Sequence, residues 1–181
     1  MDDENIPEKM DLGCGNSKPD GFFGVDMNDT EDVDLVQNLD NKNWKLPSNY
    51  FDEVRAFDIF EHVENPHIFM EEMWRVCIDG AIINIRGPHI SSSNWHDPTH
   101  KRLLGSRTFE NYTADGRFNF YSEARFKILN KKITFTWQKY PFDELGKWFA
   151  NKYTDRYEKS FVRNILPATN IIFKMEAIKA E

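Results

Sequence analysis

A short run near the N-terminus constrains the fold more than any other part of the chain. Residues 10–15 read Met-Asp-Leu-Gly-Cys-Gly, and residues 22–26 read Phe-Phe-Gly-Val-Asp. This pattern predicts a buried strand, a glycine turn and a second strand that ends in a carboxylate. A ligand can approach glycine backbone closely because no Cβ intervenes, and a carboxylate there can accept ribose hydroxyls. The pattern predicts a nucleotide-like cofactor site in an α/β fold, with an ordinary turn and a solvated Asp26 as the alternative.

The spacing of this loop distinguishes between classes of cofactor. A dinucleotide fingerprint has a third glycine and an acid about twenty residues further on. Here Asp26 lies thirteen positions after Gly13, and the loop continues as Asn-Ser. The spacing therefore disfavours a nicotinamide or flavin dinucleotide.

Several segments, in order along the chain, resemble one enzyme family. The string Asp-Leu-Gly-Cys-Gly resembles the first motif of class I S-adenosylmethionine-dependent methyltransferases, of the type 11 kind. Residues 44–54 resemble the family's passage into its fourth strand, residues 56–63 the segment that ends that strand, and residues 78–85 the turn into the fifth strand. The resemblance is collinear over roughly residues 8–90.

The resemblance implies S-adenosylmethionine as the cofactor and methyl transfer as the reaction. It places Asp26 at the ribose, Asp40 near the adenine amine and Asp58 near the methionine end. No metal ion is expected. The cofactor-binding residues implied in this way are Asp11, Gly13, Cys14, Gly15, Asp26, Met27, Leu39, Asp40 and Asp58.

The first two crossovers are shorter than the family's usual ones. Eight residues separate Gly13 from Phe22, and six separate Asp26 from Val33, whereas a helical crossover needs about ten to twelve or more. We therefore expect loops there, and a cofactor site that lacks a helix N-terminus and is more open on that side. The fold class expected is α/β: a three-layer, Rossmann-like methyltransferase sheet, mostly parallel, with an antiparallel C-terminal strand pair and reduced first crossover helices.

The hydrophobic pattern predicts the remaining elements within one domain over residues 1–181. A helix is expected from about Pro66 to Val76, and one or two helices between Leu145 and Leu166. Acceptor-side insertions are expected at 87–123 and 138–169. Strands are expected near 8–12, 22–26, 33–39, 52–57 and 80–86, with antiparallel strands at 124–129, 133–137 and 170–178 and a turn at Lys131-Lys132.

The segment after the fifth strand is rich in groups that can do chemistry. It contains His89 and the string His96-Asp-Pro-Thr-His100. Three interpretations remain open: a histidine acts as general base for the acceptor, the histidines and Asp97 bind a metal, or the segment is a structural turn in which Asp97 or Thr99 caps a following helix. Metal binding is disfavoured because Pro98 opposes the helix that would align both rings.

His62, just beyond the fourth strand, is the other candidate near the transferred methyl group. It is accompanied by Glu61, and the alternative is that both residues order the following helix. The candidate catalytic residues are therefore His96, His100 and His62.

Composition narrows the class of acceptor. The net charge of −7 and pI near 5.3 disfavour extensive nucleic-acid contact, so a small-molecule or glycan-like acceptor is favoured. Aromatic side chains are candidates for the acceptor pocket or for the core: Phe109, Tyr112, Phe118, Phe120, Tyr121, Trp148 and Phe149.

The sequence indicates a cytoplasmic protein and leaves the oligomeric state open. Cys14 and Cys77 have no disulfide or zinc spacing, and neither a membrane span nor a signal peptide is expected. Two alternatives to methyl transfer remain: a non-catalytic regulatory module that binds S-adenosylmethionine or S-adenosylhomocysteine, and another enzyme on the same cofactor, such as an aminopropyltransferase.

Overall fold

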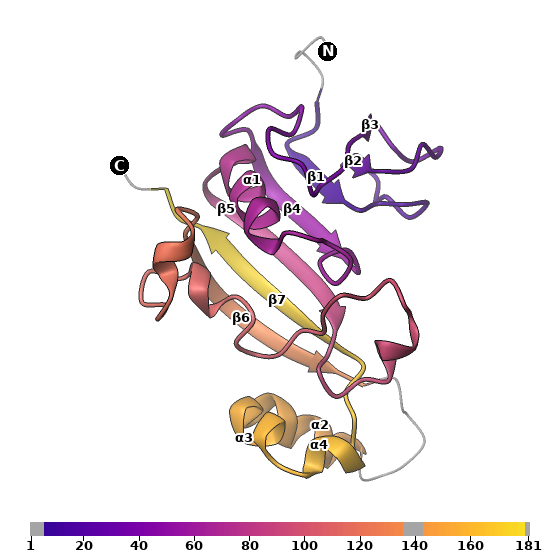
Figure 1. Cartoon of the computed structure of the whole chain (residues 1–181), viewed down its shortest axis with the longest axis vertical. Helices are drawn as coiled ribbons and strands as arrows, with labels where there is room; N and C mark the ends of the chain where they lie inside the picture. The colour runs from indigo at the N-terminus through magenta and orange to yellow at the C-terminus, as the bar shows by residue number, and fades with distance from the viewer. Residues whose placement is uncertain (1–5, 136–142, 180–181) are drawn as a thin grey trace.

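A seven-stranded mixed sheet forms the centre of the protein (Figure 1). The computed structural model describes residues 6–135 and 143–179. The strand order is β3-β2-β1-β4-β5-β7-β6, in which β1 to β5 are parallel and β7 is antiparallel to both of its neighbours. This order confirms the expected α/β class, a mostly parallel sheet with an antiparallel C-terminal strand pair. The strands are β1 Lys9–Leu12, β2 Phe23–Asp26, β3 Leu35–Val36, β4 Phe51–Phe57, β5 Cys77–Pro88, β6 Phe126–Thr134 and β7 Asn170–Ala177.

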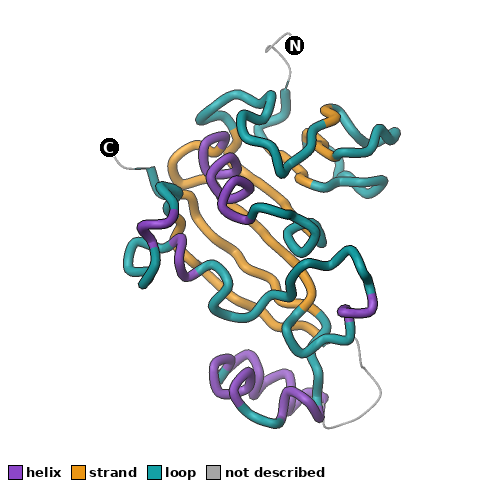
Figure 2. The backbone as a smooth tube through the Cα atoms, viewed as in Figure 1, coloured by secondary structure: helices purple, strands orange, loops and turns teal. Residues whose placement is uncertain are grey.

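Helices are few and short beside this sheet (Figure 2). The α-helices are α1 Pro66–Val76, α2 Asp143–Lys152, α3 Thr154–Lys159 and α4 Val162–Ile165, and single 3-10 turns occur at η2 Asn94–His96, η3 Glu110–Tyr112 and η4 Asn119–Tyr121.

The first two crossovers are loops, as the short spacing predicts. Residues 13–22 and 27–34 are all described and contain no helix. The start of the first loop is bonded to the end of β2, because the backbone N–H groups of Gly13 and Cys14 both donate to the carbonyl of Val25, at 2.8 and 3.3 Å. The expected reduction of these crossovers is therefore confirmed.

Helix α1 begins and ends where its sequence pattern predicts. Pro66 occupies the first helical position, and the side chain of Asn65 accepts from the backbone N–H groups of His67 and Ile68 at 3.1 and 3.2 Å. Both features favour a helix start. The helix buries Phe69 and Met73 completely, together with Met70 and Val76, against the sheet.

In the described part of the chain, a helical and loop layer covers one face of β4, β5 and β7, whereas the loops 13–22 and 27–34 pack over the other face at β2. Figure 1 shows α1 and the segment between β5 and β6 crossing the same face. Side chains on this face are fully buried, such as Ala56 of β4 and Phe173 of β7, whose ring centroid lies 4.8 Å from that of Phe109. Helices α2, α3 and α4 lie beyond the lower end of β6.

The opposite face of the sheet is polar. Arg55 of β4 and Arg86 of β5 each place the guanidinium carbon 4.6 Å from the ring centroid of Phe57. Arg55 also pairs with Asp11 at 2.9 Å. Arginine stacking over an aromatic ring keeps Phe57 covered while the charges remain hydrated. The stacked arginines therefore cover Phe57 on this face of the sheet, as packed helices cover apolar side chains on the other face.

Two details of the C-terminal half differ from expectation. Strand β6 is continuous, with an irregularity at Leu129, and Lys131 and Lys132 pair with β7, so the turn predicted there is wrong. The lysines mark an edge strand, where charged side chains are common. Three helices occupy 143–165 instead of one or two. Residue 137, the end of the second predicted strand, lies outside the described residues.

Neighbouring residues of β7 test the one-sided burial. Phe173→Ala is expected to lower the free energy of unfolding by about 3–5 kcal/mol, because it leaves a cavity against Phe109. Lys174→Ala, on the exposed face, is expected to change it by less than about 0.5 kcal/mol. Urea unfolding of both variants measures the difference, and equal losses would contradict the account.

Candidate active site

The two glycines of the β1–β2 loop serve different purposes. Gly13 has φ +70°, and a Cβ there would lie 2.7 Å from the Cβ of Ile59, which follows β4. Gly13 is therefore needed for close packing inside the protein. Gly15 has φ +51°, and nothing lies within 4 Å of where its Cβ would be. The backbone at Gly15 is thus open to an approaching ligand.

Asp26 is held at the tip of β2 by the backbone of its own loops. It is 8% exposed. One carboxylate oxygen accepts from the N–H of Gly15 at 3.1 Å, and the other accepts from the N–H and side-chain amide of Asn28 at 2.9 and 3.1 Å. A carboxylate has about four acceptor positions, so Asp26 retains capacity for a ligand hydroxyl. Met27 beside it is 65% exposed.

Asp11 anchors the loop through an arginine that the sequence did not single out. Its carboxylate is 2% exposed and pairs with Arg55 at 2.9 Å, and Arg55 also donates to the carbonyl of Ser17 at 3.1 Å. Burial raises the pKa of Asp11 to about 6, against the opposing effect of Arg55. Cys14 and Leu39 are buried in the core, at 2% and 6% exposed. The ion pair of Asp11 with Arg55 therefore holds the loop at Ser17.

Asp40 and Asp58 are engaged by other parts of the protein. Asp40 accepts from the backbone N–H groups of Glu64 and Asn65 at 2.6 and 3.1 Å and so fixes the approach to α1. Asp58 directly follows β4 and has φ +57°, and its carboxylate pairs with Arg86. Both side chains lie at the carboxyl ends of strands, where ligands bind in open α/β sheets.

Glu61 is the most unusual carboxylate at this edge of the sheet. It is 1% exposed, and burial raises its pKa to about 7. In the described structure its Oε2 atom has no hydrogen-bond partner. A Cβ on Gly87 of β5 would lie 3.1 Å from this oxygen, so glycine at position 87 leaves the room that the carboxylate occupies.

Two of the three predicted histidines meet beside Glu61. The rings of His62 and His100 have centroids 4.7 Å apart. His62 Nδ1 lies 3.0 Å from Thr99 Oγ1, and Thr99 donates to Asp97 at 2.6 Å. His100 Nδ1 lies 2.8 Å from the carbonyl of Asn94. Burial, followed by the neighbouring His100, lowers the pKa of His62.

The other histidines of the segment lie elsewhere. His96 is exposed at the end of η2 and is not part of the group around Glu61. His89 is fully buried and bonded to Glu158 at 3.1 Å and to Ser91 at 2.8 Å. It joins α3 to the sheet and is not accessible as a base.

The predicted turn at Asp97 is present, but the helix expected after it is not. Asp97 Oδ1 accepts from the backbone N–H of Thr99 at 2.8 Å. Residues 97–109, all described, contain no helix. Asp97 therefore orients Thr99, and through it His62, instead of capping a helix.

The predicted aromatic residues separate into core and surface groups. Phe109 and Tyr112 are buried. Phe118, Phe120 and Tyr121 form an exposed cluster with centroids 4.5 to 6.2 Å apart. Figure 1 places the segment that carries them on the opposite side of α1 from the β1–β2 loop. This cluster does not line the edge that carries the histidines.

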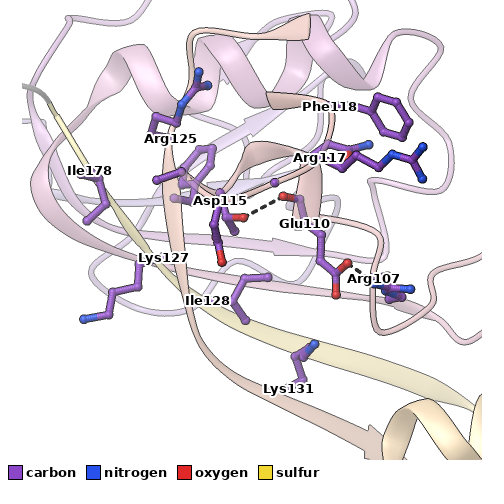
Figure 3. Close-up of a pocket in the computed structure, with 15 residues that line it drawn as sticks. Arg107, Glu110, Asp115, Arg117, Phe118, Arg125, Lys127, Ile128, Lys131 and Ile178 are labelled. Atoms are coloured by element: carbon purple, nitrogen blue, oxygen red, sulfur yellow. Dashed lines mark hydrogen bonds and ion pairs between the residues drawn. The ribbon is translucent and has the colours of Figure 1, made fainter. Parts of the chain in front are cut away.

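A hollow of about 1120 Å³ lies beside β6, away from the histidines (Figure 3). Some of its charged groups are already partnered: Arg107 pairs with Glu110 at 2.8 Å, and Lys131 donates to the carbonyl of Ser106 at 3.0 Å. The charged residues that line it are Arg107, Arg117, Arg125, Lys127, Lys131, Glu110 and Asp115.

The chain was compared with models of protein families and with curated proteins. Residues 10–85 match a family model described as a methyltransferase domain. A search of curated proteins finds no significant match. The family match covers less than half of the chain, and together with the strand order it is consistent with the fold of class I S-adenosylmethionine-dependent methyltransferases.

Several solved structures share the fold at low sequence identity. A chain from the complex between the Haloferax volcanii Trm112 methyltransferase activator and a methyltransferase is 16% identical, with a TM-score of 0.58 over 98% of this chain and 85% of that one. A S-adenosylmethionine-dependent methyltransferase from Archaeoglobus fulgidus is 15% identical, with a TM-score of 0.57 over 95% and 86%. The [4+2]-cyclase SpnF is 16% identical, with a TM-score of 0.59 over 95% and 74%.

None of the helices in the described residues is long and apolar enough to cross a membrane.

The two loop glycines give a matched pair of substitutions. Gly13→Ala is expected to cost more than about 2 kcal/mol of unfolding free energy, because the positive φ costs about 1–2 kcal/mol and the methyl group also overlaps Ile59. Gly15→Ala is expected to lower the free energy of unfolding only by the cost of the positive φ, because nothing lies near its Cβ position. Urea unfolding measures both, and a larger loss for Gly15→Ala would contradict the packing described.

The raised pKa of Glu61 predicts that the free energy of unfolding depends on pH. A carboxyl whose pKa rises from 4.5 when unfolded to about 7 when folded binds protons more tightly in the folded state. Its contribution to stability is present at low pH and is lost as the pH rises toward 7. In metal-free buffer, Glu61→Gln should therefore gain about 1–3 kcal/mol relative to wild type between pH 5 and pH 8. A difference that does not change with pH would contradict this.

Proposed function

We propose that the protein transfers a methyl group from S-adenosylmethionine to an acceptor of small-molecule or glycan type. The observation that carries the proposal is the meeting, at one edge of a methyltransferase sheet, of an open glycine backbone, a fixed carboxylate and a pair of histidines. Gly15, Asp26 and Met27 lie at the end of β1 and β2. Glu61, His62 and His100 lie beyond β4 and β5.

The described residues fit the cofactor that the family uses. The space over Gly15 admits a ligand to the backbone. Asp26 would accept ribose hydroxyls with its remaining acceptor capacity, and the exposed side chain of Met27 would cover part of the adenine. Asp11, Cys14 and Leu39 would support this loop, with Asp40 and Asp58 bordering the site. When bound, the cofactor supplies a methyl group on a positively charged sulfur, a leaving group that requires no further activation.

The histidines are proposed to act on the acceptor. An acceptor hydroxyl or amine loses a proton as its lone pair bonds to the methyl carbon and the carbon–sulfur bond breaks. His62 or His100 would receive that proton, because both rings are held in place through Nδ1 by Thr99 and by the carbonyl of Asn94. His96, exposed on the same segment, would contact the acceptor from outside.

The nature of the acceptor is inferred from charge. The net charge of −7 and the acidic loop around Asp26 and Asp29 oppose the approach of a polyphosphate chain. A neutral hydroxylated or amino acceptor meets no such barrier. We place the reaction in the cytoplasm, as the cofactor and the free thiols of Cys14 and Cys77 suggest.

A specific observation favours a second function. Asp26 is already held by Gly15 and Asn28, and the first crossovers lack helices, so the chain retains a minimal cofactor site. The same fold also serves proteins with other activities, as in the cyclase SpnF. The second candidate is a regulatory module that binds S-adenosylmethionine or S-adenosylhomocysteine without turnover.

Calorimetric titration with S-adenosylmethionine tests the first requirement. Wild type is expected to bind, and Asp26→Ala to weaken the affinity by about tenfold to a hundredfold, because it removes a charged acceptor from a buried position. Asp29→Ala removes an exposed acid of the same loop and serves as the control. Absence of binding by wild type would contradict both candidate functions.

Transfer of a labelled methyl group separates the two candidates. Protein, labelled S-adenosylmethionine and fractionated cell extract should give label in the small-molecule or glycan fraction. His62→Ala should reduce the rate at least about a hundredfold while cofactor affinity stays within about twofold. Cofactor binding with no transfer to any fraction would favour the regulatory module, and label in nucleic acid would contradict the proposed acceptor class.

A further inference from the structure

Three side chains at the carboxyl edge of the sheet form a group that the proposed proton transfer explains only in part, because it gives Glu61 no role. Glu61, His62 and His100 each offer one ligand atom, and these atoms lie within 4.8 Å of one another. They come from two segments that are distant in sequence: the connection from β4 to α1, and the connection that follows β5. Lys101, next to His100, donates its backbone N–H to the carbonyl of Glu61 at 2.8 Å, which keeps the two segments in contact.

The carboxylate of Glu61 lacks the partner that its burial requires. The residue is 1% exposed, and its Oε2 atom has no hydrogen-bond partner within the part of the chain that the structure describes. A buried, unpaired polar group is destabilising, and more so when it is charged. Such a group calls for an unobserved ligand or ion. The carboxylate group lies beside the two histidines, so that a cation among the three would compensate its buried charge.

In both histidines the hydrogen bond is made by Nδ1, which leaves Nε2 of each ring free. A carbonyl oxygen only accepts, so His100 Nδ1 donates to Asn94. Thr99 uses its single hydroxyl hydrogen on Asp97, at 2.6 Å, and therefore accepts from His62 Nδ1. Nε2 of each ring then carries the lone pair. Metal-binding histidines are commonly fixed in this way by a carbonyl or a polar group on the other nitrogen.

We propose that Glu61, His62 and His100 bind a divalent transition-metal ion of the class of Zn²⁺ or Fe²⁺. Two imidazoles and one carboxylate are a ligand set typical of these ions. At metal–ligand distances of about 2.0–2.2 Å the ligand atoms would stand roughly 3.4 Å apart. The exposed segment around Thr99 must therefore move inward by about 1 Å.

The ion would leave room for a further ligand. Three protein ligands are typical of sites that keep an open position for water or substrate. Asp97, whose Oδ2 lies 3.7 Å from His100 Nε2, provides a second carboxylate beside the ion. The site would tie together the two segments that border the proposed acceptor side. The inference goes beyond the proposed function and is an alternative to the general-base role of His62 and His100, because a ring whose Nε2 binds the ion cannot also accept a proton there.

Direct metal binding by the full chain tests the proposal. Chelator-treated protein is titrated with Co²⁺, whose visible absorption reports on its ligands, and in separate arms with Zn²⁺ and Fe²⁺ under anaerobic conditions. One equivalent is expected to bind, and a tetrahedral or five-coordinate Co²⁺ spectrum is expected. The Zn²⁺ and Fe²⁺ arms show which ion is preferred.

Variants identify the ligands and the residue that orients them. His100→Ala and Glu61→Gln should each weaken Co²⁺ affinity more than about a hundredfold, and Thr99→Val by about tenfold, because it frees the His62 ring. His96→Ala removes an exposed histidine of the same segment and should leave the affinity unchanged. Far-UV circular dichroism of metal-free samples verifies that each variant is folded, and His100→Ala carries the test if Glu61→Gln is not.

Two results would overturn the proposal. One is the absence of wild-type binding tighter than about 1 mM, a level typical of weak surface sites. The other is an equal loss of affinity in His96→Ala and His100→Ala. Neither result bears on cofactor binding, which the calorimetric titration with S-adenosylmethionine measures separately.

Discussion

Burial of a single face of the sheet is the constraint on which the rest of this structure depends. Apolar side chains of β4, β5 and β7 pack against α1 and the segment between β5 and β6, and residues such as Ala56, Ile85 and Phe173 are fully buried there. Crossovers without helices leave the other face to water. That face is stable because it carries stacked and paired charges, with Arg55 and Arg86 over Phe57.

The same constraint determines how the candidate site is built. Parallel strands bring their carboxyl ends to one edge, so that the loops after β1, β2, β4 and β5 meet. A helix N-terminus after β1 would normally help to hold an anionic group. Here the loop is held by Asp11 through Arg55, and Asp26 is fixed by backbone N–H groups of Gly15 and Asn28. Side-chain carboxylates thus hold this loop in place, where a helix would follow β1 in other proteins of this fold.

Sequence predicted the features that depend on local pattern. The mostly parallel sheet with its antiparallel C-terminal strand pair follows from the family resemblance, α1 from its apolar spacing, and the looped crossovers from counting residues. The continuous strand β6 was missed because Lys131-Lys132 looks like a turn when its partner strand is unknown. The break of residues 143–165 into three helices likewise depends on contacts such as Asn151 with Ile133 of β6.

The sequence identified residues of the candidate site, but not which of their side chains contact one another. His62 and His100 were both candidates, yet only the fold brings their rings to 4.7 Å and separates them from His96. Glu61 was expected at most to order a helix, because its burial depends on the room left at Gly87. The roles of Arg55 and Thr99 arise from contacts across 44 and 37 positions, which no local pattern reports.

The central claim is that S-adenosylmethionine binds at the carboxyl edge between β1 and β4. Hydrogen–deuterium exchange of the amides, with and without S-adenosylmethionine, tests it most directly. Added cofactor is predicted to slow exchange in residues 11–17 and 24–28 and in residues 58–64, and to leave β6 unchanged. Protection confined to the hollow beside β6, or no protection anywhere, would contradict the account.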